Sequence, residues 1–116
     1  MTTPIALAFT PFEAMAETLI PHAMTGNDGA HDIAHIIRVF GNAMRIQARE
    51  GGDRRVLAAA ALLHDCVAVE KNSPLRAQAS RLAAEKASVI LADLGWDKAD
   101  IAAVAHAVAR MSGLVG

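Results

Sequence analysis

Two short clusters of histidine and aspartate have the residue types and spacing of a metal site. His31, Asp32 and His35 stand within five residues, and His64 is followed directly by Asp65. In a helix, residues i and i+4 lie on one side, so His31 and His35 would occupy adjoining turns. Imidazole and carboxylate are good ligands for a divalent ion, and ligands from two helices can converge on one ion inside a bundle. The combination predicts a divalent metal centre.

Each of these residues taken alone also has a purely structural explanation. Asp32 can complement the dipole at the start of a helix, although the helical wheel points it toward an apolar side, where a carboxylate is costly unless paired. His31 alone is typical of a surface residue. The His64-Asp65 pair can also mark the place where an apolar helix meets solvent, since adjacent helical residues diverge by about 100°.

A second group of residues has the chemistry of phosphate binding. Lys71 and Arg76 follow the His-Asp pair, and Arg76 falls in the first turn of a predicted helix, where the dipole does not favour cations. A bound anion would explain them, since exposed amides, an ammonium and a guanidinium fork suit a phosphate. Solvated surface charge near Glu70 is the alternative. His106 lies off the apolar stripe of its helix. It could therefore contact phosphate or a second ion, or it could be an ordinary surface histidine.

Composition indicates that these residues are held by one bundle of helices. The 116 residues make one domain, 53% of them hydrophobic and only 3% aromatic, so small aliphatic side chains must form the core between closely spaced helices. The expected fold is all-α, with about five helices. Net charge is -1 with both signs interspersed, which argues against duplex nucleic acid and anionic membranes as partners. The single cysteine, Cys66, is expected in the core.

The first two helices are predicted from caps, turns and periodicity. Residues 1–9 form an irregular lead-in without a signal peptide or membrane anchor, and Thr10-Pro11 is an N-cap with proline at the first helical position. Pro21 is expected to kink or end that helix. Turn-forming residues at 25–29 precede a helix over 30–50. The apolar side of the second helix comprises Ile33, Ile36, Val39, Phe40, Ala43 and Ile46, opposite Arg38, Asn42, Arg45 and Arg49.

The central helix follows Gly51-Gly52 and is expected to be capped by Asp53. Residues 56–63 are apolar on every side, so this helix should be surrounded by others and end near residues 65–67. Ser73-Pro74 repeats the cap-and-proline signal for a fourth helix closed by Gly95, and Asp97 caps a fifth that ends at Gly113. The apolar positions of these last two helices are Leu75, Ala79, Leu82, Ala83, Val89, Ile90, Leu94, Ile101, Val104, Ala105 and Val108.

Taken together, these motifs resemble the HD-domain superfamily of metal-dependent phosphohydrolases. The resemblance covers nearly all of residues 31–108 and implies a single HD-like helical domain over 1–116. Within the superfamily the chain is most similar to a small bacterial branch of predicted phosphohydrolases acting on nucleotides or related phosphate compounds. The matching segments are HDIAHIIRV at 31–39, AAALLHDCV at 59–67, KNSPLR at 71–76, Ser80 with Ala83-Ala84-Glu85, and IAAVAHAV at 101–108.

The resemblance implies a metal-ligand set of His35, His64 and Asp65. The family's fourth ligand is an aspartate on a later helix, after the position of His106, and this chain stops ten residues beyond His106. The expectation is therefore a shortened chain that lacks the family's last helices and one ligand. The resemblance does not distinguish Mn, Mg, Fe, Co, Ni and Zn as the ion.

Two hypotheses for function follow. In the first, the chain is a cytoplasmic hydrolase of small phosphoesters or phosphoanhydrides, in which the ion polarises a phosphoryl oxygen and acidifies a bound water that Asp32 orients or deprotonates. Lys71, Arg76 and His106 would bind the phosphate. In the second, the shortened chain is catalytically silent and serves as an oligomerisation or interaction module, since loss of the later helices would uncover apolar surface.

Overall fold

Helices make up nearly all of the part of the chain that the structure describes. The computed structural model describes residues 6–23, 29–64 and 78–115. Within these ranges there are five α-helices and no strand, which confirms the all-α prediction. The elements are a 3-10 helix η1 (Ala6–Phe9), α1 (Glu13–Ala23), α2 (Gly29–Glu50), α3 (Arg54–Leu63), α4 (Ala79–Asp93) and α5 (Lys98–Val115).

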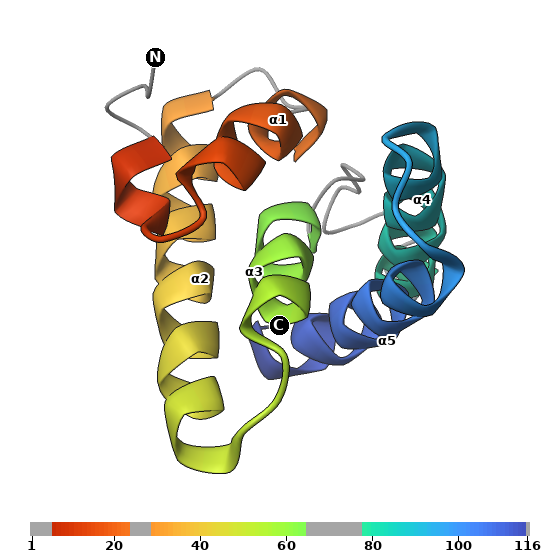
Figure 1. Ribbon diagram of the computed structural model, residues 1–116. Coiled ribbons are helices and arrows are strands. Elements are labelled where there is room, and N and C mark those ends of the chain that lie inside the picture. The colour runs from red at the N-terminus through yellow and green to blue at the C-terminus, as the bar shows by residue number, and fades with distance from the viewer. Residues whose placement is uncertain (1–5, 24–28, 65–77, 116) are drawn as a thin grey trace.

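Helix α3 lies at the centre of the bundle (Figure 1). It packs against α1, α2 and α5, whereas α4 lies on the outer side of α5. The side chains of residues 58–63 have no exposed surface, as the apolar sequence of this helix predicts. Burying a leucine contributes about 1.5–3 kcal/mol, so Leu62 and Leu63 are major sources of stability and fix the end of α3 that carries His64.

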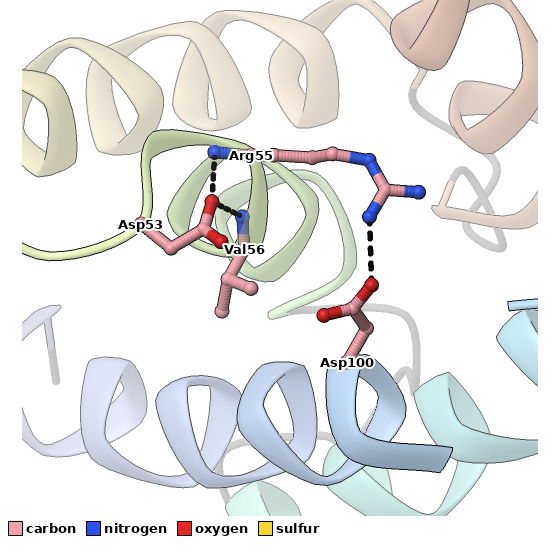
Figure 2. A network of polar contacts seen from close by, with 4 residues as sticks. All are labelled: Asp53, Arg55, Val56 and Asp100. Carbon is pink, nitrogen blue, oxygen red and sulfur yellow. Dashed lines mark hydrogen bonds and ion pairs between the residues drawn. The ribbon is translucent and has the colours of Figure 1, made fainter. Parts of the chain in front are cut away.

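The start of α3 is fixed by the predicted cap. Asp53 has extended backbone angles, and its carboxylate accepts the backbone N–H groups of Arg55 at 2.9 Å and Val56 at 3.3 Å (Figure 2). Gly51 and Gly52 both have positive φ, which residues with a Cβ rarely adopt, so the chain reverses there between α2 and α3. The cap satisfies two amides that a helix start otherwise leaves unpaired.

The side chain of Arg55 also connects α3 with α5. The guanidinium of Arg55 donates to the carboxylate of Asp100 on α5 at 3.0 Å (Figure 2). The same guanidinium lies 3.8 Å from the ring centroid of Trp96, a cation–π distance. Arg55 therefore links the first turn of α3 with the α4–α5 connection and the start of α5.

The N-terminal residues contribute to the core, which corrects the prediction of an irregular lead-in. Ala6 and Phe9 in η1 are fully buried, and the rings of Phe9 and Phe12 pack edge-on against Phe40 of α2, with centroids 5.1 and 6.5 Å apart. Few aromatic residues are present, and these three cluster. Their burial gives the lead-in its fixed position, which no periodicity over so short a segment could predict.

The boundaries of α1 also differ from the prediction. The helix begins at Glu13, not at Thr10-Pro11, and the Thr10 hydroxyl donates back to the carbonyl of Leu7 in η1. Pro21 lies inside α1, which continues to Ala23. Proline in the last turn removes only one intrahelical hydrogen bond, so the helix reaches its end despite it.

Helix α2 has the predicted amphipathic character with one exception. Ile36, Val39, Phe40 and Ala43 are buried, whereas the polar positions opposite them are exposed. Ile46 lies on the predicted apolar side, but 46% of its surface is exposed. Helix α2 packs mainly against α3, and among the described elements α2 and α5 do not pack closely against each other, so the side of Ile46 stays open.

Helices α4 and α5 pack against each other as a pair. The turn between them has Gly95 at a φ of 84°, as predicted, and α5 begins directly after Asp97. Val89 in α4 and Leu94 directly after it, two of the apolar positions noted in the sequence, are 61% and 40% exposed. Since α4 packs mainly against α5, its buried side chains form one narrow stripe. Its buried members are Ala83, Ala87, Ile90 and Leu91, and those of α5 are Val104 and Val108.

Several predictions concern residues outside the described ranges. These include the Ser73-Pro74 start of the fourth helix, which is described from Ala79 onward, and the place of Cys66. The predicted end of α5 at Gly113 is two residues short of the observed end at Val115. None of the described helices has the length and apolarity needed to cross a bilayer.

Candidate metal centre

The structure brings together two of the three predicted metal ligands. His35 comes from the first half of α2 and His64 from the end of α3, and the two helices lie side by side (Figure 1). Their Nε2 atoms are 3.1 Å apart, and the ring centroids are 5.1 Å apart with the planes tilted by 48°. Residues 29 positions apart in the chain thus point one nitrogen each at a common place.

The position of the proton on His64 follows from its second hydrogen bond. This side chain is only 5% exposed, and its Nδ1 lies 2.7 Å from the carbonyl oxygen of Ala61. A carbonyl only accepts, so the proton is on Nδ1 and Nε2 carries the lone pair of the neutral ring. In this tautomer the lone pair can accept from Nε2–H of His35, and it is equally the form that binds a metal.

The two histidines fit a shared divalent ion. Metal–nitrogen bonds of about 2.0–2.1 Å at tetrahedral or octahedral angles place two ligand nitrogens about 2.9–3.4 Å apart, and the observed separation of 3.1 Å falls in that range. Histidine ligands usually donate the other ring N–H to a carbonyl or carboxylate, as His64 does to Ala61. Ligation by His35 through Nε2 requires its proton to move to Nδ1.

The other predicted site residues apart from His106 are only partly within the described ranges. Asp65, Lys71 and Arg76 lie outside the described ranges, and so do the side chains of His31 and Asp32, whose backbone is in the first turns of α2. Among the described residues, no group of three or more His, Cys, Asp or Glu side chains could hold a metal ion. Within those residues the centre is therefore a two-histidine pair.

His106 is not placed with this pair. It is exposed on α5 and lines a groove between the later half of α2 and α5, a groove whose lining includes neither His35 nor His64. Its predicted position off the main apolar stripe of α5 is confirmed, since Val104 and Val108 form the buried stripe.

The family comparison agrees with the positions of these residues. The family model of the HD domain matches residues 32–115, which include His35, His64 and Asp65. The chain belongs to the HD domain family. HD domains are helical, and in general the family consists of metal-dependent phosphohydrolases that bind divalent ions. Comparison with curated proteins and with solved structures gave no match.

The hydrogen bond from His64 to Ala61 was not anticipated from the sequence, although a signal for it exists. His64 follows the last residue of α3 and stands three residues after Ala61. The last carbonyls of a helix lack intrahelical donors, and a polar side chain just beyond the end can pair with one. A histidine after a long apolar helix therefore has a carbonyl ready to orient its ring.

Proposed function

We propose that this HD domain hydrolyses a phosphoester or phosphoanhydride, with a divalent ion held by His35, His64 and Asp65. The observation that carries the proposal is the approach of the two Nε2 atoms to 3.1 Å, with His64 oriented from behind by Ala61. A hydrogen-bonded, nearly buried imidazole loses little freedom when it binds an ion, which favours metal binding over a solvated surface pair.

The proposed substrate is a nucleotide or a related small phosphate compound. When bound, the divalent ion supplies Lewis acidity toward a phosphoryl oxygen and makes water more acidic. Asp32 lies three residues before His35 on α2, so it is close enough along the chain to orient or deprotonate the attacking water. Lys71 and Arg76 are assigned to the substrate phosphate on the basis of their charge and their place after the His-Asp pair.

The test measures metal binding and hydrolysis with the same set of variants. Isothermal titration with Mn²⁺, Mg²⁺, Co²⁺, Ni²⁺ and Zn²⁺ should show one site for at least one ion. His35→Gln and His64→Gln should each weaken it at least tenfold, since a ligand is lost. His22→Gln is the matched control, because His22 is an exposed histidine on α1 and its replacement should leave binding unchanged. Phosphate release from a panel of nucleotides should be reduced in His35→Gln and His64→Gln and unchanged in His22→Gln.

Two results would contradict the proposal. One is the absence of binding for all five ions at millimolar concentration, and the other is binding that neither histidine substitution weakens. Metal binding without release of phosphate from any compound of the panel would support the centre and contradict the hydrolase function.

The second candidate is a catalytically silent module that associates with other copies of itself. The observation that favours it is exposed apolar surface at the end of α4, where Val89 of the helix and Leu94 directly after it are 61% and 40% exposed. Exposed aliphatic side chains on one helix are typical of an association face. Self-association together with absent hydrolysis distinguishes this candidate from the first.

A further inference from the structure

A groove separate from the histidine pair runs between α2 and α5. It has a volume of about 840 Å³, and its walls are the second half of α2 and most of α5, which do not pack closely against each other. Helix α3 packs against both walls, and its first turn contributes Val56 and Leu57 to the lining. The groove is therefore bounded by three helices and open toward solvent.

The inner surface of this groove is aliphatic. Its apolar residues are Val39, Ala43, Ile46, Val56, Leu57, Ala103 and Ala107. Its described lining residues include no Phe, Tyr or Trp, and the one ring is the imidazole of His106. Most of these side chains are small, which allows another backbone to approach closely. Ile46, which is 46% exposed, is the largest apolar side chain that the fold leaves open on this side.

Arginines from both walls border the apolar surface. Arg45 and Arg49 come from α2, one turn apart, and Arg110 comes from α5. All three are exposed. Arg45 donates to the neighbouring Asn42, and neither Arg49 nor Arg110 has an ion-pair partner among the described residues. Their charges are therefore available to a ligand in the groove.

Two of the three carboxylates in the groove lining are already engaged. Asp53 accepts the first amides of α3, and Asp100 accepts the guanidinium of Arg55 (Figure 2). Asp100 is thus paired with a cation, whereas Glu50 and the cap residue Asp53 keep their negative charges at the groove. With Arg55 counted, four guanidinium groups lie at the groove against three carboxylates, and this small positive excess favours an acidic ligand.

The length of the groove matches a short helix. The lining residues extend from Val39 to Glu50 on α2 and from Asp100 to Arg110 on α5. At 1.5 Å per residue, each wall is about 15 Å long, which is about three helical turns. An amphipathic helix in such a groove buries its apolar stripe and places flanking side chains beside the rims.

We propose that this groove binds a helical segment of a partner protein whose apolar stripe is flanked by acidic residues. A second copy of this chain is disfavoured as the occupant, since the exposed residues of α4 mix both signs of charge, as Arg81 and Glu85 do. The inference is independent of the proposed hydrolase function, because the groove contains neither His35 nor His64.

The probe is a fluorescein-labelled, end-capped peptide of three to four turns with leucines at i, i+3, i+4 and i+7 and glutamates on both flanks. A matched peptide carries lysine in place of every glutamate. Fluorescence anisotropy should give about 3- to 10-fold tighter binding for the acidic peptide, the effect of a few exposed ion pairs. Amide chemical shifts should move at Ala43, Ala103 and Ala107 of the groove and not at α4.

A charge-reversal variant makes the test specific. Arg49→Glu together with Arg110→Glu should reverse the preference, so that the lysine peptide binds more tightly. Arg81→Glu is the matched control, an exposed arginine on α4 outside the groove, and should retain the original preference. Circular dichroism verifies that each variant folds.

Three outcomes would overturn the proposal. The first is equal binding of the two peptides to the wild-type protein, and the second is the absence of shifts in the groove at millimolar acidic peptide. The third is a concentration-dependent dimer that the Arg49→Glu, Arg110→Glu variant disrupts, which would assign the groove to a second copy of the chain.

Discussion

Replacing Asp53 should destabilise the protein through loss of the α3 cap. Its carboxylate accepts two backbone N–H groups, at 2.9 and 3.3 Å, and lies at the positive end of the helix dipole. Asp53→Ala removes both hydrogen bonds and the charge and should lower the free energy of unfolding by about 1–2 kcal/mol. Asp53→Asn keeps an acceptor and loses the charge, so it should cost about 0.3–1 kcal/mol.

The same chemical change at the other end of a helix should have the opposite sign. Asp93 is the exposed last residue of α4, where a carboxylate is unfavourable next to the negative end of the dipole. Asp93→Asn should therefore raise the free energy of unfolding by about 0.3–1 kcal/mol at low ionic strength. This variant is the matched control for Asp53→Asn, since both remove one negative charge.

The measurement is urea unfolding followed by circular dichroism, with thermal unfolding as a second readout. For a chain of this length, 1 kcal/mol corresponds to about 3–5 °C in Tm. Hydrogen exchange of the Arg55 and Val56 amides should accelerate in Asp53→Ala. If Asp53→Ala and wild type unfold within about 0.3 kcal/mol of each other, or if Asp53→Asn and Asp93→Asn change stability in the same direction, the cap argument is refuted.

Three further substitutions test the packing of the bundle. Leu62→Ala should lower the free energy of unfolding by about 2–5 kcal/mol in urea unfolding, because this side chain is fully buried in α3. Arg55→Met should cost about 1 kcal/mol in the same assay, since it removes the exposed ion pair with Asp100 and the cation–π contact. Val89→Glu should change stability by less than about 0.5 kcal/mol, because Val89 is 61% exposed, and should lower the mass seen by light scattering if α4 mediates association.

Each of these substitutions has a control and a contradicting result. Leu7→Ala is the control for Leu62→Ala, because Leu7 is 58% exposed and its replacement should hardly change the free energy of unfolding. Equal losses of stability in the two variants would contradict the central place of α3. Asp100→Asn should lower the free energy of unfolding by part of the amount that Arg55→Met does. If the two losses add fully in the double variant, the side chains of Arg55 and Asp100 do not interact. A large stability loss in Val89→Glu would mean that α4 is covered on that side.

The sequence predicted the helices wherever local signals and the global fold agree. The all-apolar run of α3, the Asp53 cap and the turns at Gly51-Gly52 and Gly95 were all confirmed. These features act over a few residues, through hydrogen bonds and allowed backbone angles, so the order of residues is sufficient to specify them.

The sequence was less informative where a residue's surroundings come from distant segments. Ile46, Val89 and Leu94 are apolar positions of predicted helices, yet each is substantially exposed because none of the described elements covers it. Conversely, Ala6 and Phe9 were assigned to an irregular lead-in and are fully buried. An apolar stripe shows which face of a helix can be buried. The elements that pack against the helix decide how much of that face is buried.

For the candidate centre, the sequence identified the ligand residues and the tertiary structure decided their geometry. His35 and His64 were identified from residue type, spacing and resemblance to the HD family, because ligand chemistry is a property of the side chains themselves. Only the packing of α2 against α3 decided that their Nε2 atoms lie 3.1 Å apart, and only the end of α3 at Leu63 placed His64 on the carbonyl of Ala61. Convergence of residues 29 positions apart depends on how two helices cross, and that is set by the whole core.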